Sequence, residues 1–379
     1  MFAASGPARG AIRLAHVFPT FDVGGVQVRF AALAARLGGR FHHTIISLGG
    51  GDRARELLAA DTPVVFAEPA SSAGPLPTRL AAFRARLAAL EPDILVTYNW
   101  GAIEYALANR FAGLPHLHHE DGFGPEESHG QLRRRVWTRR LALARSDVVV
   151  PSLTLRDIAQ RTWRLAPDRV HHIPNGIEPG RHPATSLEAL APGLPEGLPR
   201  VVWTGALRPE KNPLRLLRAF AAVRDRAVLV VIGEGPEREA MEHEARRRGL
   251  GTSLRMLGHR TDARDIIAQC QILVLSSDTE QMPISVMEAM DAGLAVVATD
   301  VGDVARMVAS ENRPYITPPD DARLAGALRR LLDDEALRAR LGRANQERLR
   351  TAYPMEAMVE AYRALLIRLA ARRQAAEHG

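Results

Sequence analysis

The sequence predicts an α/β protein that contains two doubly wound domains, each built on a parallel sheet. Short β-branched strands alternate with helical segments along the chain, which is typical of helices layered on a parallel sheet. The 379 residues exceed what one hydrophobic core usually organises. The alternation stops once, in a segment rich in Pro and Gly at 178–200, and then starts again. We therefore expect two domains joined by a linker, with a cleft between them.

The first domain is predicted to span residues 1–177. Its strands are expected where short apolar runs rich in Val and Ile occur, and its helices where apolar residues recur at helical spacing. The expected strands are 11–18, 43–48, 63–67, 93–98, 115–119, 147–150 and 170–174. The expected helices are 25–37, 77–90, 102–112 and 130–144.

The second domain is predicted to span residues 201–350, where the same alternation returns. The expected strands are 200–205, 227–232, 253–257, 272–275 and 295–298. The expected helices are 213–223, 236–248 and 283–291. The tail from 320 onward is helical and rich in Ala, Leu and Arg, and we expect the helix at 351–379 to pack back on the first domain.

Composition and charge narrow the class of protein. With 46% apolar and 25% charged residues, the chain has the composition of a globular domain. No apolar run approaches the roughly 18 to 20 residues of a membrane span, and the N-terminus lacks a clear signal-peptide core, so we expect a cytoplasmic protein. The net charge of +7 suits an anionic partner such as a nucleotide, a lipid headgroup or a nucleic acid. A single cysteine, Cys270, excludes an internal disulfide and reads as a buried filler.

The first candidate site is the loop "GALRPEKN" at 205–212, which follows a strand and precedes a helix. Gly205 allows close approach to the backbone, and Arg208 and Lys211 lie next to the free N–H groups of a helix start, which suits a phosphate group. Most such pairs belong to solvated surface loops. Lys211, however, is the only lysine among 50 basic residues, which favours a site that requires a compact ammonium.

The second candidate site is "TEQMPISVMEAM" at 279–290. Pro283 suits the first position of a helix, which leaves the amides of Ile284 and Ser285 directed at an anion. Glu280 precedes this helix, and Glu288 lies about 7 to 8 Å along it. A nucleotide sugar would match that layout of sugar, diphosphate and ribose. Taken singly, each glutamate is better explained as a helix-dipole partner or an exposed helix charge.

The glycines of "GEGP" at 233–236 form a third loop at the same edge of the predicted sheet. Gly233 lies where a backbone amide is able to approach a donor molecule. A lone GxG is a weak signal, and a simple tight turn is nearly as good an explanation.

Together these segments resemble the family 4 retaining glycosyltransferases, and "GGVQ" at 24–27 and "IPNGI" at 173–177 extend the resemblance over essentially the whole chain. The resemblance implies the GT-B architecture, two Rossmann-like domains facing a cleft, with the acceptor on the first domain and the donor on the second. It implies that Arg208 and Lys211 bind the donor diphosphate, that Glu280 contacts the sugar and that Glu288 contacts the ribose. Gln281 departs from the glycine often found after the first glutamate.

In the first domain, Gly24 and Gly25 follow the first strand and lead into a helix. Backbone amides there would close over the donor phosphates, a role that the resemblance also implies, although a tight turn explains the glycines equally well. Asn99, at another junction between a strand and a helix, is expected to shape the acceptor pocket.

The run "HLHHED" at 116–121 ends a predicted strand. Adjacent strand residues point to opposite faces, so the run does not supply all its ligands to one metal ion, and we expect no metal and no cofactor. The resemblance implies that a histidine here, His118 or His119, lies near the reacting sugar. Glu120 and Asp121 are candidate acceptor contacts or bases, with an ordinary polar turn as the stronger alternative.

The segment 131–145 is basic and amphipathic. Six arginines surround apolar residues that include Trp137 and Leu141, namely Arg133, Arg134, Arg135, Arg139, Arg140 and Arg145. Such a helix is able to lie on an anionic membrane, which would suit a lipid-linked acceptor, although a solvated helix face is more common.

The prediction is therefore a metal-independent, retaining glycosyltransferase that moves a sugar from a UDP-linked or GDP-linked donor to a saccharide or lipid-linked hydroxyl, in bacterial polysaccharide or glycolipid synthesis. It would work in the cytoplasm or at the inner face of the cytoplasmic membrane. The alternatives are a nucleotide-sugar epimerase of the same fold and a non-catalytic basic module that binds membrane or nucleic acid. Arginines spread over both halves and an aromatic content of only 5% argue against nucleic acid.

Overall fold

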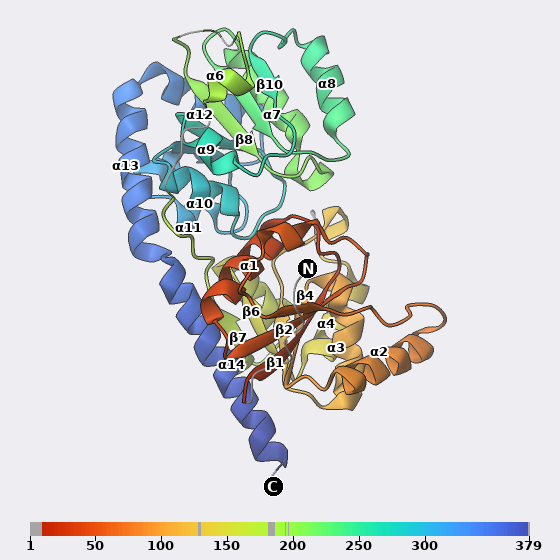
Figure 1. The fold of residues 1–379 in the computed structure, drawn as a ribbon. Helices are drawn as coiled ribbons and strands as arrows, with labels where there is room; N and C mark the ends of the chain where they lie inside the picture. Colours follow the sequence, from red (N-terminus) through yellow and green to blue (C-terminus); the bar gives the residue numbers. More distant parts are fainter. Residues whose placement is uncertain (1–9, 128–129, 181–185, 194, 196, 378–379) are drawn as a thin grey trace. The chain divides into compact units, whose positions relative to one another are not determined.

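The computed structural model describes residues 10–127, 130–180, 186–193, 195 and 197–377. The chain divides into two compact units (Figure 1). Unit 1 comprises Met1–Gly122, His129–Asn175 and Glu356–Gly379, and unit 2 comprises Phe123–Ser128 and Gly176–Met355. The predicted N-terminal residues 1–9 and part of the predicted linker lie outside the described residues.

Unit 1 is built on a seven-stranded parallel sheet with the strand order β3-β2-β1-β4-β5-β6-β7. The strands are β1 (Ile12–Phe18), β2 (Phe41–Ser47), β3 (Val64–Phe66), β4 (Ile94–Tyr98), β5 (His116–His119), β6 (Asp147–Val150) and β7 (Val170–His172). The helices are α1 (Gly25–Leu37), α2 (Leu76–Leu90), α3 (Ile103–Ala112), α4 (Arg133–Leu143), α5 (Leu153–Asp157) and, at the end of the chain, α14 (Met355–Glu377).

Unit 2 is built on a six-stranded parallel sheet with the strand order β10-β9-β8-β11-β12-β13. The strands are β8 (Arg200–Thr204), β9 (Val228–Ile232), β10 (Leu254–Met256), β11 (Ile272–Leu275), β12 (Ala295–Thr299) and β13 (Ile316–Thr317). The helices are α6 (Leu187–Leu190), α7 (Pro213–Phe220), α8 (Arg238–Arg247), α9 (Ala263–Ile267), α10 (Ile284–Asp291), α11 (Val304–Met307), α12 (Asp321–Asp333) and α13 (Glu335–Ala352).

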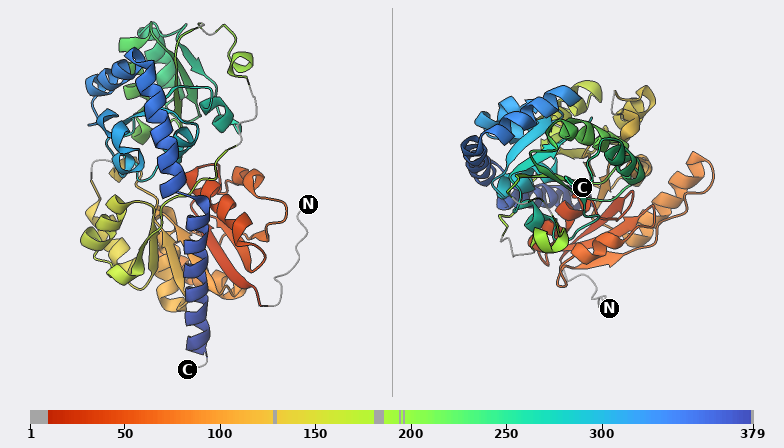
Figure 2. Two further views of the ribbon diagram at one scale, coloured as in Figure 1. Left: turned by 90° about the vertical axis from the view of Figure 1, so that its left-hand side faces the viewer. Right: turned by 90° about the horizontal axis from the view of Figure 1, so that it is seen from above.

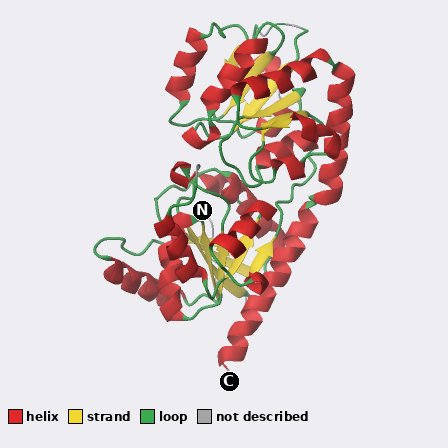
Figure 3. Cartoon of the chain, turned by 180° about the vertical axis from the view of Figure 1, so that it is seen from behind, coloured by secondary structure: helices red, strands yellow, loops and turns green. Residues whose placement is uncertain are grey.

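The sheet of unit 2 is buried on both faces, as the doubly wound fold requires. Along β11, Ile272 and Val274 join one hydrophobic cluster with α7 and α12, and Leu273 and Leu275 join another with α9 and α10. In each unit the strands lie between layers of helices (Figure 3). The predicted α/β class with two parallel sheets is therefore confirmed.

The C-terminal helix α14 lies along unit 1 (Figure 2). Its Arg363 donates a hydrogen bond to the carbonyl of Arg36 at the end of α1 (3.0 Å), and its Arg372 pairs with Asp147 at the start of β6 (2.8 Å). Contacts with α1 and β6 therefore hold this helix to the first half of the chain.

The segment 178–200, predicted as a linker, is instead part of unit 2. Leu187, in the short helix α6, and Ala191 are buried in the core of that unit. The high Pro and Gly content predicted a linker, because only a few apolar residues in this segment attach it to the core. Among the described residues, no helix is long and apolar enough to cross a membrane.

Candidate functional site

Unit 2 has its topological switch point between β8 and β11, because β9 lies on the other side of β8 and β12 on the other side of β11. In open parallel sheets, ligands bind beyond the carboxyl ends of the strands at such a point. The loop after β8 carries Gly205, Arg208 and Lys211, and the loop after β11 carries Glu280. The sequence and the topology therefore indicate the same candidate site, at the loops after β8 and β11.

The structure brings Lys211 and Glu280 together. The Nζ of Lys211 lies 2.6 Å from Oε1 of Glu280, and the hydroxyl of Ser277 donates to the same oxygen (2.8 Å). The lysine side chain is 28% exposed and the glutamate side chain 9%, so the ammonium faces solvent more than the carboxylate does. Arg208 is exposed, and no described residue makes a hydrogen bond with its side chain. The site therefore offers an ammonium held by Glu280 and an exposed guanidinium.

Helix α10 begins one residue later than predicted. Pro283 is extended (φ −67°, ψ 125°) and precedes the first helical residue, Ile284. Its carbonyl accepts from Val286 (3.2 Å), which leaves the amides of Ile284 and Ser285 without a partner within the helix. The predicted anion-binding amides keep their position at the helix start.

Glu288 lies on the second turn of α10 and is partly buried. Burial raises the pKa of its carboxyl to about 7, while nearby Arg264 lowers it and Asp291 raises it. Arg264 is engaged by Asp291, whose Oδ2 lies 2.5 Å away. No described residue makes a hydrogen bond with the Glu288 carboxyl, so a hydroxyl-bearing ligand would give it a partner.

Two glycines at this edge of the sheet allow backbone segments to approach each other closely. A Cβ on Gly233 (φ +147°) would lie 1.8 Å from the carbonyl oxygen of Gly205, so this glycine allows the loops after β9 and β8 to pack together. A Cβ on Gly302 (φ +57°) would lie 2.3 Å from the carbonyl oxygen of Glu280. Gly302 thus supports the Glu280 loop, a role that its position in the sequence did not reveal.

Unit 1 has the same kind of switch point between β1 and β4. Gly24 is the extended residue that caps α1, followed by Gly25 as its first residue. Asn99 follows β4 in a left-handed conformation (φ +54°), and its Oδ1 accepts from the amide of Asp121 after β5 (2.7 Å). The structure therefore joins two of the predicted acceptor residues.

His118 and Glu120 do not reach the surface, which contradicts the predicted acceptor contact for Glu120. Both side chains are fully buried, and Glu120 accepts from Nε of Arg139 (3.0 Å) on α4. His118 faces the hydroxyl of Thr97 (2.7 Å). Arg139 is itself 1% exposed and lies over the rings of Trp100 and Trp163, so it does not belong to the solvent face of the basic helix as predicted.

His119 points to the opposite side of β5, as the alternation predicts. It is 4% exposed and stacks between Tyr98 and Tyr362 of α14, with ring centroids 4.7 and 5.4 Å away. Burial, with Arg29 and neighbouring histidines, holds its pKa well below the usual value. His119 is thus a neutral core residue, with Arg29 of α1 near its Nδ1 (3.5 Å).

The run "HHED" contains two carboxylates, those of Glu120 and Asp121. Only Asp121 is partly exposed, with 12% of its side chain accessible. Both its oxygens accept from Arg29, which also donates to Asn175 (3.0 Å). Arg29 lies 92 residues away in the sequence, so no local pattern indicated this pair. The carboxylate is held as an acceptor of hydrogen bonds and is poorly suited to act as a base.

Helix α4 is basic, but its apolar and basic residues are exposed together and do not lie on opposite faces as an amphipathic helix requires. Trp137 is 64% exposed, Leu141 57% and Leu132 42%, and Arg133, Arg134 and Arg145 are exposed beside them. We call these six residues the α4 patch.

Among the described residues, no group of three or more His, Cys, Asp or Glu residues is arranged to hold a metal ion.

Two Rossmann-like units, each with a switch point, are the architecture of the GT-B glycosyltransferases. A family model described as "Glycosyl transferases group 1" matches residues 188–348, and one described as "Glycosyltransferase Family 4" matches 23–181. Together the two models cover most of the chain. The chain therefore belongs to the glycosyltransferases that these models describe, and it is an enzyme.

The chain is also similar to curated proteins that are named as glycosyltransferases. The chain is 32% identical over 174 residues to the lipopolysaccharide core biosynthesis glycosyltransferase LpsD of Rhizobium meliloti, which covers 46% of this chain and 50% of that protein. It is 27% identical over 382 residues to D-inositol 3-phosphate glycosyltransferase of Stackebrandtia nassauensis, which covers 89% of this chain and 86% of that protein. The match to LpsD thus spans only half of that relative.

Solved structures confirm the fold. Anabaena HepE in complex with UDP and glucose superimposes with a TM-score of 0.80 at 18% identity, covering 94% of this chain and 99% of that chain. WaaG, a glycosyltransferase involved in lipopolysaccharide biosynthesis, gives a TM-score of 0.72 at 18% identity, covering 93% and 99%. At these identities the likeness supports the GT-B fold alone.

Proposed function

We propose that the protein transfers a sugar from a UDP-linked or GDP-linked donor to a hydroxyl acceptor, with retention and without a metal ion, in bacterial polysaccharide or glycolipid synthesis. The family supplies the reaction class. HepE was solved with UDP and with UDP-glucose, and LpsD is named for lipopolysaccharide core biosynthesis, which supports the donor class and the pathway class.

The observation that carries the proposal is the ammonium of Lys211 on Glu280, next to the start of α10. In this assignment Lys211, Arg208 and the amides of Ile284 and Ser285 offset the negative charge that develops on the departing nucleotide. Glu280 accepts hydrogen bonds from the donor sugar, and Glu288 accepts them from the ribose. These residues bring preorganised charge to the leaving group.

The acceptor side of the proposal rests on unit 1. Asp121, fixed by Arg29 and Asn99, accepts a hydrogen bond from the acceptor hydroxyl and so orients it. His118 and His119 lie within the core behind this residue and take no direct contact in the proposal. Gly24 and Gly25 offer backbone amides at the start of α1.

The first test is thermal stabilisation of the purified protein by UDP, GDP, ADP and CMP and by their common sugar conjugates, with Lys211→Ala and Glu288→Ala as controls. One diphosphate should stabilise the wild type selectively, and both variants should lose that effect. Stabilisation that survives Lys211→Ala would remove the proposed donor site.

The chemistry is tested once the donor is known. Incubation without acceptor distinguishes transfer from epimerisation, because an epimerase releases nucleotide or altered sugar without one. With acceptor present, transfer should persist in EDTA, and the anomeric configuration of the product, measured by NMR, should match that of the donor. An inverted product would contradict retention.

We also propose that the α4 patch binds the anionic inner face of the cytoplasmic membrane. Exposed Trp137 and Leu141 would enter the interface, while Arg133, Arg134 and Arg145 would pair with anionic headgroups. This position would suit a lipid-linked acceptor, which the partner class of the proposal includes.

Vesicle flotation tests the patch. The wild type should float with vesicles that contain phosphatidylglycerol and stay behind with phosphatidylcholine alone, and the double variant Trp137→Ser/Leu141→Ser should lose flotation. Leu76→Ser, at an exposed leucine on α2, is the matched control and should float like the wild type. Equal flotation with both lipids, or no flotation, would contradict the proposal.

A further inference from the structure

The two loops that carry Lys211 and Glu280 are tied together by their backbones. The hydroxyl of Ser276, which follows β11, donates to the carbonyl of Lys211 (3.0 Å). The amide of Asp278 donates to the carbonyl of Glu210 (2.8 Å). The loop after β8 therefore rests on the loop after β11 at the residues next to the ion pair.

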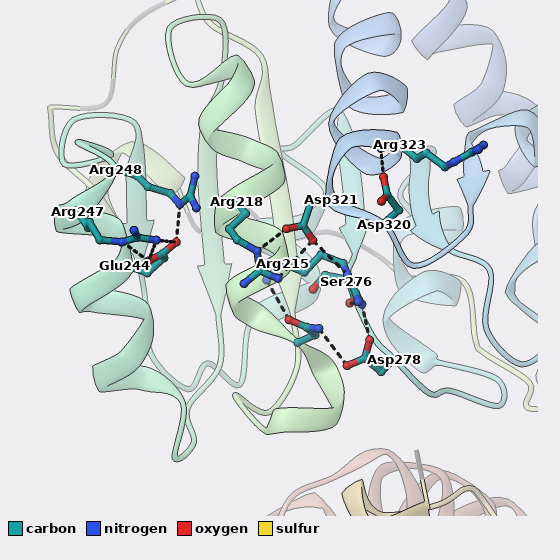
Figure 4. A network of polar contacts seen from close by, with 11 residues as sticks. Arg215, Arg218, Glu244, Arg247, Arg248, Ser276, Asp278, Asp320, Asp321 and Arg323 are labelled. Carbon is teal, nitrogen blue, oxygen red and sulfur yellow. Dashed lines mark hydrogen bonds and ion pairs between the residues drawn. The ribbon is translucent and has the colours of Figure 1, made fainter. Parts of the chain in front are cut away.

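Asp278 extends this tie into its side chain. One carboxylate oxygen accepts from Nδ2 of Asn212 (3.0 Å), and the other accepts from Nη1 of Arg215 (2.5 Å). The same Nη1 donates to the carbonyl of Ser276 (2.9 Å). Arg215, on α7, thus holds the loop after β11 at two points, in the network of Figure 4.

The start of α7 is fixed by the same residues. Asn212 has a left-handed conformation (φ +43°), and its Oδ1 accepts from the amide of Arg215 (3.0 Å), while Pro213 takes the first helical position. Asn212 immediately follows Lys211. One side chain therefore caps the helix, contacts Asp278 and fixes the backbone next to the ammonium.

Burial makes this arrangement stiff. Arg215 is 9% exposed, and the Asp278 side chain 22%. Hydrogen bonds between ionised partners that are shielded from water are stronger than neutral ones, and their loss leaves a charge without its partner. Lys211 is one residue from Asn212, and Glu280 is two residues from Asp278, so a shift of these contacts would change the separation of the two side chains.

We propose that Arg215 is a positioning residue that acts through Asp278 to set the separation of Lys211 and Glu280 for donor binding. This inference rests on the proposed donor site. Arg215 is not expected to touch the nucleotide. Its effect is to keep the ammonium and the carboxylate at one spacing when the diphosphate arrives, because losing a well-placed hydrogen bond to a charged group weakens binding by about 10- to 100-fold.

Arg218 provides the matched control. It lies one turn further along α7 and pairs with Asp321 of α12 (Figure 4), and no described residue of either loop makes a hydrogen bond with its side chain. Arg215 also approaches Asp321 (3.5 Å), so both arginines stabilise the same helix pair. A merely structural role would make the two substitutions equivalent.

The experiment compares Arg215→Gln, Arg215→Lys, Arg218→Gln, Asp278→Asn and Lys211→Ala by calorimetric titration with UDP, GDP and ADP, alongside the unfolding midpoint of each free protein. Arg215→Gln and Asp278→Asn should each weaken binding of the preferred diphosphate by about 10- to 100-fold. Their double variant should lose no more than either single change, because both break one clamp. Arg215→Lys should recover part of the loss, and Arg218→Gln should change the Kd less than about threefold.

Equal losses of affinity in Arg215→Gln and Arg218→Gln would overturn the inference, as would unchanged affinity in Asp278→Asn. Those results, with binding still lost in Lys211→Ala, would leave the proposed donor site standing. Unchanged affinity in Lys211→Ala would overturn the donor site and this inference together.

Discussion

The two units share one topology but use their switch points differently. In unit 2 Lys211 and Glu280 stand on loops, and the ammonium of Lys211 is partly exposed. In unit 1 His116, His118 and His119 stand on β5 itself, and all are buried. A parallel sheet buries whatever its strands carry, so only residues beyond the last ladder position reach a ligand. Asp121 and Glu120 both follow the last paired residue of β5, His119, but Glu120 is buried against Arg139 of α4 and only Asp121 is partly exposed.

The largest effect is expected from Arg139→Met in unit 1. The substitution leaves the fully buried carboxylate of Glu120 without its cation, which should cost about 3 to 5 kcal/mol of the free energy of unfolding. Urea unfolding measures this loss, and nucleotide binding by the remaining folded protein should be unchanged. The double variant Glu120→Gln/Arg139→Met should lose less. A cost below about 1 kcal/mol for Arg139→Met would show that water reaches Glu120.

A smaller effect is expected from Gly302→Ala in unit 2. The new Cβ would meet the carbonyl of Glu280 in a left-handed conformation, so the loop must move, at a cost of about 1 to 3 kcal/mol. Nucleotide affinity should fall as well, which thermal shift with the preferred diphosphate measures. Gly326→Ala is the control, because nothing lies near that helical position, and it should stabilise by about 0.5 to 1 kcal/mol.

The units should respond to pH with opposite signs. In unit 1, burial lowers the pKa of His43 and His116 to about 3, and that of His16 and His119 well below the usual 6.5. Below pH 6.5 these histidines bind protons in the unfolded chain but stay neutral in the folded unit. The free energy of unfolding of unit 1 therefore falls as the pH falls from about 6.5.

In unit 2, the pKa of Glu288 is raised from 4.5 to about 7. Between these values the folded unit holds a proton that the unfolded chain releases, so this group makes stability fall as the pH rises from about 4.5 to 7. Hydrogen exchange at pH 5, 6 and 7.5, corrected for intrinsic rates, should show unit 1 opening more in acid. Glu288→Gln should flatten the response of unit 2 in that window. An unchanged response would assign the slope to other groups.

The smallest effect on stability is expected at the α4 patch. Trp137→Ser/Leu141→Ser should change the unfolding midpoint by less than about 2 °C, because both side chains already face solvent. The change is therefore specific to membrane binding, and a large loss of stability would show that α4 packs against more than its present neighbours.

Periodicity predicted most of the fold, because buried parallel strands and their covering helices carry long, repeated signals. The helix at 25–37 and the strand at 272–275 have the predicted bounds. The short elements α5, α9 and β13 were missed, because five residues or fewer give a period little room to appear. The prediction of a linker at 178–200 was wrong for a related reason, since only single apolar residues attach this segment to the core of unit 2.

The site was less predictable where partners are distant in sequence. Lys211 was singled out by its composition and Glu280 by the family motif, but neither signal reveals that they form an ion pair. Arg215 and Asp278 lie 63 residues apart and look like ordinary surface charges. Burial of Glu120 depends on Arg139 arriving from another element, which alternation along one strand does not encode.

The ion pair between Lys211 and Glu280 also affects which ligand stays bound. On the proposed assignment, a diphosphate that takes the ammonium leaves Glu280 with only the hydroxyl of Ser277. A complete nucleotide sugar brings hydroxyl groups that replace the lost partner, whereas the bare nucleotide does not, and a poorly paired carboxylate is costly in a shielded place. The resting ion pair would therefore compete more effectively with the spent nucleotide than with a fresh donor, and its return would help the enzyme to turn over.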